Sequence, residues 1–412
     1  MKINYGMLAF GLSMILCAIL FYLPQNYNDP DSYSYLSIAK HIEQSDNTAL
    51  GNILYDQGLS AGRGFLFFTY ILCVIIVLDI TGCNWWLAAI FALMPLNLFM
   101  NGFYSRLDKN ILEVFLFLVF IMIHFGLYED YNKEHVIYGR KISVRVPGEV
   151  FYVVYMILFM LVARYMWQGS MIFMVYAFPY LIFMCWKKLL KPYVFIPLLA
   201  LGAYCVVQMA SYWSFINPFI NETSLSIFHL MIPEFILFIV LLYAFHKDLP
   251  LRYLVMSLIV LTSIFFLPRL ITFVSVLFVV GINQVWDRIN WKWLWILPLA
   301  VIWIPEMAYF HTDAYSMIKD MPDPCDHNCT IISDWSYGHI YRYYWNETVK
   351  YRASPPDIHE ELYYLYYQNL TCDDCVYVIH PDDYDRFDSY AKVLHMPILN
   401  LTRHDEIIVT RR

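Results

Sequence analysis

Three acidic residues lie far apart in the chain: Asp31, Asp108 and Glu222. Asp31 and Asp108 lie in polar stretches beside long apolar ones, and Glu222 is the single carboxylate of an apolar loop. Carboxylates combined with neutral oxygen atoms are the ligands that hard divalent cations such as Mg²⁺ and Mn²⁺ prefer. Arg269 lies between two apolar stretches, where a cation usually pairs with an anion. A divalent cation beside a guanidinium suits a diphosphate leaving group, because both neutralise its developing negative charge.

Each of these stretches also has a structural explanation. Asn28-Asp29-Pro30 forms turns readily. The charged residues at Arg106 to Lys109 could cap a helix or reach to the membrane surface, as Arg269 also could. The aromatic stretch from Ser333 to His339 could be a packed turn that uses Gly338 for backbone freedom. Only their convergence on one face of the molecule would favour a functional site.

The composition limits the classes of protein that can bring such residues together. The 412 residues are 60% hydrophobic, 19% aromatic and only 15% charged, with a net charge of −7. Soluble domains are about 45–50% apolar and about 25% charged. A soluble globule, a disordered chain and a nucleic-acid-binding protein are therefore excluded, and a polytopic membrane protein is expected.

The apolar stretches predict about 11 transmembrane helices, since a span needs about 20 mostly apolar residues. The first is expected to be retained rather than cleaved as a signal peptide, because it lacks a small-residue cleavage site. The expected spans are 4–24, 64–80, 85–101, 110–128, 149–166, 168–186, 192–213, 233–246, 251–268, 270–285 and 293–310.

Basic residues in short loops predict the orientation. They gather in the loop 129–148, in 187–191, around Lys247 and Arg252, and around Arg288 and Lys292. With 11 spans all four loops lie on one side, which is therefore cytoplasmic. The acidic residues, the outer loops 25–62 and 214–232 and the C-terminal region then lie on the extracytoplasmic side of a multi-pass cell-membrane protein.

Residues 311–412 differ from the predicted membrane domain, residues 1–310, since they hold 9 Lys and Arg against 17 Asp and Glu. Short β-like runs at Thr330–Ser333, Val376–His380 and Glu406–Thr410, with a helix after Pro355-Pro356, predict a small C-terminal α/β domain. All Asn-x-Thr sequons fall on the expected outer side: Asn221, Asn328, Asn346, Asn369 and Asn400. The outer cysteines could form disulfides, bind zinc or stay free: Cys325, Cys329, Cys372 and Cys375.

The order of these motifs resembles the catalytic subunit of oligosaccharyltransferase, a GT-C fold glycosyltransferase, in its archaeal form especially. Asp31 to Leu36 is similar to the family's first acidic motif, D-P-Y-Y-x-L, and Asp108 to Val114 is similar to its second, D-H-H-x-x-E-V. Ile220-Asn221-Glu222 is similar to the glutamate motif of the long outer loop. Ser333 to His339 is similar to the signature S-W-W-D-Y-G-H, although its first Trp and its Asp are replaced here.

The resemblance implies a site for protein N-glycosylation. Asp31, Asp108, Asn110 and Glu222 would hold Mn²⁺ or Mg²⁺, and Asp31 and Glu222 would also engage the acceptor asparagine. Arg269 would bind the diphosphate of a lipid-linked oligosaccharide donor, carried on dolichol or another polyprenyl chain. The side chain of a Thr or Ser in the acceptor's N-x-S/T sequon would be bound by the residues Trp335, Ser336, Tyr337 and Gly338. A single-subunit enzyme is expected, without a nucleic-acid partner.

Two other classes fit the sequence less well. Another GT-C transferase, such as a protein O-mannosyltransferase or a lipid-modifying glycosyltransferase, usually has an adjacent acidic pair in its first outer loop, whereas Asp29 and Asp31 are separated by a proline. A membrane transporter or channel should have charges or broken helices at mid-membrane depth. Here the charges lie mainly at the outer ends of the spans.

Overall fold

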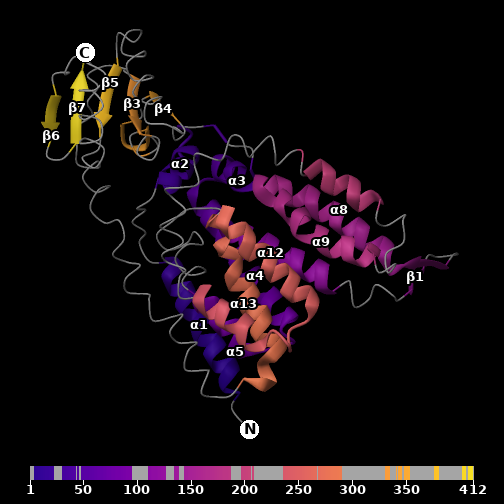
Figure 1. Ribbon diagram of the computed structural model, residues 1–412. Helices are drawn as coiled ribbons and strands as arrows, with labels where there is room; N and C mark the ends of the chain where they lie inside the picture. The colour runs from indigo at the N-terminus through magenta and orange to yellow at the C-terminus, as the bar shows by residue number, and fades with distance from the viewer. Residues whose placement is uncertain are drawn as a thin grey trace.

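Helices fill most of the apolar stretches of this chain in the computed structural model (Figure 1). The residues that the structure describes are 4–22, 30–42, 44–45, 48–94, 110–126, 134–138, 143–186, 196–205, 207, 235–266, 268–289, 330–334, 340, 342–345, 348–352, 375–379, 401–404 and 407–411.

Every expected span from 4–24 to 270–285 falls on a described helix, and the span 293–310 lies outside the described residues. Within the described ranges, only α4 is both long and apolar enough to cross a membrane by itself, so the number of spans stays a prediction. The helices are α1 (Tyr5–Tyr22), α4 (Leu59–Ile80), α5 (Trp85–Leu93), α6 (Asn110–Ile121) with the π-helical turn η2 (Met122–Gly126), α8 (Gly148–Met166), η3 (Gln168–Met171) with α9 (Ile172–Trp186), Ile196–Cys205, Phe235–Phe245, α12 (Leu251–Phe266), and η4 (Pro268–Ile271) with α13 (Thr272–Val285) and η5 (Trp286–Arg288).

The loop 25–62, which is expected on the outer side, contains two short helices, α2 (Pro30–Ala39) and α3 (Ala49–Gln57). Proline is favoured in the first turn of a helix, where its missing N–H has no partner to lose, so Pro30 begins a helix rather than a turn. Thr48 caps α3, since its hydroxyl oxygen accepts a hydrogen bond of 3.1 Å from the Gly51 N–H. Gly58, at a φ of 82°, then allows α4 to follow at once.

Polar contacts join segments that the expected topology places at the same end of the helical body. Arg288, after α13, forms an ion pair with Asp248, before α12. In the first outer loop, the Asn52 amide donates a 3.1 Å hydrogen bond to the hydroxyl of Tyr165, in the last turn of α8. Both contacts agree with helices that alternate in direction.

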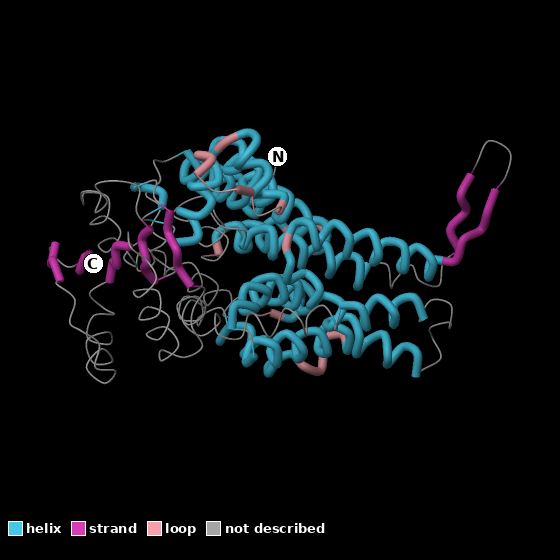
Figure 2. Tube along the Cα trace, turned by 90° about the horizontal axis from the view of Figure 1, so that it is seen from above, coloured by secondary structure: helices cyan, strands magenta, loops and turns pink. Residues whose placement is uncertain are grey.

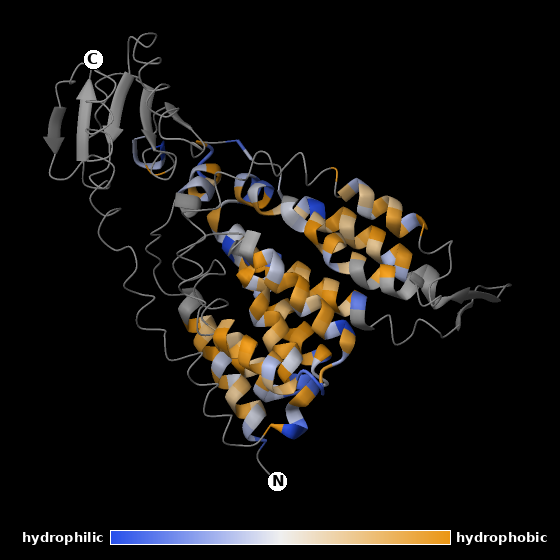
Figure 3. Ribbon diagram, in the orientation of Figure 1, coloured by the Kyte–Doolittle hydropathy of each residue, from blue (hydrophilic) through white to orange (hydrophobic). Residues whose placement is uncertain are grey.

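Large apolar side chains cover outward faces of the helical body. On α1, Leu12 is 59% exposed and Ile15 58%, and on α8 Leu161 is 66% exposed and Val162 58%. Figure 3 shows apolar residues along most of the helices and hydrophilic residues towards their ends. Faces of this kind are costly in water and suit the hydrocarbon core of a membrane.

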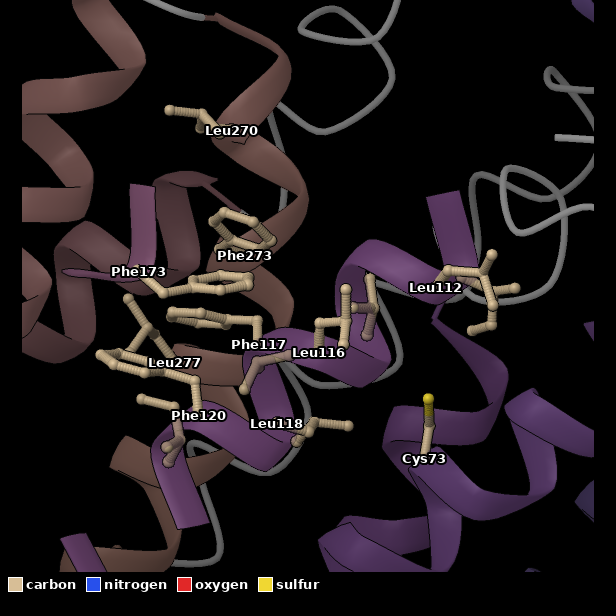
Figure 4. Packing of buried hydrophobic residues seen from close by; sticks show 14 of the residues in the cluster. Cys73, Leu112, Leu116, Phe117, Leu118, Phe120, Phe173, Leu270, Phe273 and Leu277 are labelled. Carbon is tan, nitrogen blue, oxygen red and sulfur yellow. The ribbon is translucent and has the colours of Figure 1, made fainter. Parts of the chain in front are cut away.

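The centre of the body is an aromatic cluster around Phe117 of α6 (Figure 4). The Phe117 ring stacks on Phe273 of α13 with a centroid distance of 4.3 Å and an interplanar angle of 24°. Phe173 of α9 lies 6.0 Å from Phe117 and 5.7 Å from Phe273. All three side chains are fully buried, so three helices are joined at one point.

A mixed five-stranded sheet lies at one end of the body, beside α2 (Figures 1 and 2). Its strands are β3 (Thr330–Asp334), β4 (Thr348–Arg352), β5 (Cys375–Ile379), β6 (Leu401–His404) and β7 (Ile407–Arg411), in the order β4-β3-β5-β7-β6. The three predicted β-like runs are thereby confirmed as strands. β3 pairs in parallel with β4 and β5, and Cys375 is the register partner of Thr330. The other three outer cysteines and the expected helix after Pro356 lie outside the described residues.

The loop 129–148 contains an antiparallel hairpin, which was not predicted from the sequence. Its strands are β1 (Glu134–Tyr138) and β2 (Ser143–Pro147). The hairpin lies at the far end of the helical body from the five-stranded sheet (Figure 2). This placement agrees with the expected assignment of the two regions to opposite sides of a membrane.

Replacing Phe117 with Ala should lower the free energy of unfolding by about 3 kcal/mol, because it leaves a cavity where three helices meet. Denaturant titration in detergent measures this loss. Leu158→Ala on the exposed face of α8 is the control and should change stability by less than about 1 kcal/mol. Equal losses in the two variants would contradict a central role for the aromatic cluster.

Candidate functional site

The helix that carries Asp31 packs against the chain segment that follows the C-terminal signature. Asp31 is the second residue of α2, and its side chain is not among the described ones. Tyr33, Tyr35, Leu36 and Ile38 of the same helix are buried. The acidic motif therefore sits on an anchored helix rather than on a solvated turn.

The contact consists mainly of tyrosines. The hydroxyl oxygens of Tyr33 and Tyr344 are 3.1 Å apart and share a hydrogen bond. The Tyr33 ring lies 5.4 Å from the Tyr343 ring and 5.6 Å from the Tyr344 ring, measured between centroids. The Lys40 ammonium, just after α2, lies 3.8 Å from the centre of the Tyr343 ring. These contacts join residues that are about 300 positions apart in the sequence.

This contact relates two of the predicted motifs. Tyr33 is two positions after Asp31, and Tyr343 is five positions after Gly338. Trp335, Ser336, Tyr337 and Gly338 lie outside the described residues, so their side chains are not placed. The described residues that follow them are firmly packed, since Ile340 is fully buried and Trp345 is 8% exposed. The residues that follow the first acidic residue and those that follow the signature are thus in contact with each other.

The second acidic motif continues into a buried helix. Asp108 lies outside the described residues, but Asn110 is the first residue of α6 and is fully buried. Glu113, one turn further on, is only 1% exposed. Residues three apart lie on the same side of a helix, so an amide and a carboxylate share one side of α6 near its start.

Glu113 is a buried carboxylate that the predicted site did not include. Glu113 belongs to the stretch Asp108 to Val114 that is similar to the second acidic motif, and it lies within the expected span 110–128. A carboxylate that is removed from water needs a cation, a metal or hydrogen-bond donors nearby. Glu113 could have been identified by its spacing, because it lies three residues after Asn110 and therefore on the same side of the expected helix.

Arg269 lies four positions before Phe273, which belongs to the same aromatic cluster as Phe117 of α6. It lies in the short 3₁₀ helix η4, and its side chain is not among the described ones. Leu270, Ile271 and Thr272, which follow it, are buried, and the next residue is Phe273, which stacks on Phe117. The helix α13, which directly follows the turn with Arg269, is therefore packed on α6, the helix that begins at Asn110.

The expected ligand set can be assessed by its donor chemistry. Asp31, Asp108, Asn110 and Glu222 offer carboxylate and amide oxygens, which fit Mn²⁺ or Mg²⁺. Glu222 and the loop 214–232 lie outside the described residues. Among the side chains that are described, no group of three or more His, Cys, Asp or Glu is arranged to hold a metal ion.

Comparison with known proteins gives matches by structure but none by sequence. No protein-family model and no curated protein sequence matches the chain. A crystal structure of the Archaeoglobus fulgidus oligosaccharyltransferase in complex with Zn and sulfate matches with a TM-score of 0.56 and 10% identity, over 93% of this chain and 69% of that one.

A second match is the archaeal oligosaccharyltransferase AglB from Archaeoglobus fulgidus, in complex with an inhibitory peptide and a dolichol-phosphate. It has a TM-score of 0.56 and 11% identity, over 92% of this chain and 70% of that one. The chain is similar in fold to archaeal oligosaccharyltransferases. The expected similarity to the oligosaccharyltransferase fold is thereby supported for the helical architecture, while the number of spans and the C-terminal domain stay predictions.

If the Glu113 carboxylate contributes negative charge to a cation site, Glu113→Gln should weaken Mn²⁺ binding about tenfold while retaining the side chain's size. Electron paramagnetic resonance of free Mn²⁺ in a titration of the purified protein measures the change. Asp56→Asn on the exposed side of α3 is the control, because it removes one acidic charge from the outer loop. Equal Mn²⁺ affinity in the Glu113→Gln variant and the wild type would remove Glu113 from the site.

Proposed function

We propose that this protein transfers an oligosaccharide from a lipid diphosphate carrier to the side-chain amide of asparagine in N-x-S/T sequons. The observation that carries the proposal is the contact of α2 with the segment 340–345, because it relates Asp31 to the Trp335–Gly338 signature. The similarity in fold to oligosaccharyltransferases and the order of the four motifs and Arg269 support it.

The exposed apolar faces support a place in a membrane for the helical body. We assign residues 1–310 to a multi-pass GT-C-like catalytic domain and residues 311–412 to a soluble domain on the extracytoplasmic side, where the active site would also lie. A lipid-linked donor could then enter from the membrane plane, and an acceptor polypeptide from the aqueous side. The inhibitory peptide and the dolichol-phosphate bound by the Archaeoglobus fulgidus enzyme are of these two chemical kinds.

The acceptor amide would be activated by Asp31 and Glu222. Their carboxylates accept hydrogen bonds from the amide N–H groups and draw the nitrogen lone pair out of conjugation with the carbonyl. The nitrogen then attacks the first carbon of the donor sugar, the bond from that carbon to the diphosphate oxygen breaks, and one amide proton passes to one of the two carboxylates.

The leaving group would be stabilised by Arg269, whose guanidinium donates paired hydrogen bonds to phosphate oxygens. Asp31, Asp108, Asn110 and Glu222 would hold Mn²⁺ or Mg²⁺. When bound, such an ion supplies positive charge that offsets the charge developing on the diphosphate.

The sequon would be recognised by the signature residues. Trp335, Ser336, Tyr337 and Gly338 would bind the hydroxyl of the Thr or Ser two positions after the acceptor asparagine. Because α2 is packed on the segment that follows, this recognition would place the acceptor amide within reach of Asp31.

Asp31→Ala, Asp108→Ala and Glu222→Ala should each reduce transfer to an N-x-T peptide by at least about 100-fold, as is typical when transition-state stabilisation is lost. Mass spectrometry of the peptide after incubation with a lipid-linked donor measures transfer. Chelation should stop the wild-type reaction, and Mn²⁺ or Mg²⁺ should restore it.

Asp56→Ala is the matched control, because it removes an exposed carboxylate from the same outer loop and should leave transfer unchanged. Wild-type activity in any of the three variants would refute that residue's role.

A further inference from the structure

The contact between α2 and the segment 340–345 consists of directional interactions that can fix the position of one element relative to the other. We define the tyrosine clamp as Tyr33, Lys40, Tyr343 and Tyr344. It combines one hydroxyl–hydroxyl bond of 3.1 Å, two contacts of the Tyr33 ring, a Tyr343–Tyr344 edge contact at 5.1 Å and the Lys40 cation over Tyr343. Each of these interactions depends on direction as well as on distance.

Both sides of the clamp are already anchored by apolar packing. On α2, Leu36 and Ile38 are buried in the core, and in the other segment Ile340 and Trp345 are. Hydrophobic burial is non-directional and would tolerate small shifts between the two elements. The hydrogen bond between the Tyr33 and Tyr344 hydroxyls and the contact of Lys40 with the Tyr343 ring favour one alignment of α2 against the segment 340–345, which apolar packing alone does not.

This register matters because of what lies nearby in the sequence. Asp31 is two positions before Tyr33, and the signature ends five positions before Tyr343. A shift between the two elements would move the proposed sequon-binding residues relative to the carboxylate that engages the acceptor amide. Displacements of about 1 Å between reacting groups can lower rates by about 100-fold.

We propose that the tyrosine clamp is a positioning device for the acceptor polypeptide, with Tyr33 and Tyr344 as its central pair. This inference rests on the proposed function. The clamp acts through the segments that it joins, so Tyr33 and Tyr344 are positioning residues and do not touch the reacting atoms. The donor lipid diphosphate, assigned to Arg269 on a different element, is bound independently of the clamp.

Tyr33→Phe and Tyr344→Phe test the proposal, because each removes one hydroxyl and keeps the ring. Each should raise the KM for the acceptor peptide by about 2- to 10-fold, the equivalent of one net hydrogen bond, with the KM for the donor unchanged. Since both variants break the same bond, the double variant should be no worse than either single one. Equal effects on the donor and acceptor KM values, or additive effects in the double variant, would overturn the proposal.

Tyr165→Phe is the matched control. It removes a tyrosine hydroxyl that also joins two outer elements at 3.1 Å, through Asn52, but lies outside the clamp. This variant should leave the acceptor KM at the wild-type value. A rise equal to that in Tyr344→Phe would show a general structural effect and overturn the specific role of the clamp.

Hydrogen exchange distinguishes a failure of the clamp from a failure of the proposed function. Peptides that cover residues 340–345 should exchange faster in the full-length Tyr344→Phe variant than in the wild type, and at the wild-type rate in Tyr165→Phe. If the wild type performs no transfer, the proposed function is wrong. The exchange rates then still show whether the tyrosine clamp fixes the position of the segment 340–345. Unchanged exchange in Tyr344→Phe would overturn the clamp, whatever the activity.

Discussion

The stacking of Phe117 on Phe273 is the interaction on which the arrangement of the candidate site depends. Asn110 begins the helix that carries Phe117, about 10 Å further along it at 1.5 Å per residue. Arg269 lies four positions before Phe273. One pair of buried rings therefore constrains both the element expected to contribute a metal ligand and the element expected to bind the donor diphosphate.

A second constraint comes from outside the helical body. The segment 340–345 connects to the five-stranded sheet through β3 and β4, yet Ile340 and Trp345 belong to the core of the helices. The segment with the two tyrosines is thus anchored in the helical core by Ile340 and Trp345 and joined to α2 by Tyr343 and Tyr344. An acceptor polypeptide bound near the signature would meet the first acidic motif without a large movement of the sheet.

Much of this architecture could be predicted from the sequence, because long apolar stretches and short β-like runs are strong local signals. Such signals predicted the strands β3, β5 and β7 and the helices α1, α4, α5, α6, α8, α9, α12 and α13. The helices α2 and α3, in the expected loop 25–62, and the strand β4 were not predicted. β6 was missed because Leu401–His404 has no apolar run, and its pairing with β7 is decided by distant residues. The hairpin β1–β2 was not predicted, because the loop 129–148 was interpreted only through its basic residues, which indicate the orientation of the chain in a membrane.

The structure around the candidate site could be predicted only in part. Asn28-Asp29-Pro30 suggested a turn, whereas Pro30 begins a helix whose buried residues hold it in place. Burial of Glu113 could not be read from a motif that crosses the boundary of a span. The partnership of Tyr33 with Tyr344 has no local signal at all, since it depends on the folding of the whole chain.

We propose that this protein carries out N-glycosylation. The most direct test is incubation of the purified full-length protein with a polyprenyl-diphosphate-linked oligosaccharide, an N-x-T peptide and Mn²⁺, followed by mass spectrometry with fragmentation of the peptide. We expect a peptide heavier by the whole glycan, with the added mass on the asparagine of the sequon. Attachment to the threonine hydroxyl, or an unmodified peptide beside intact donor, would contradict it.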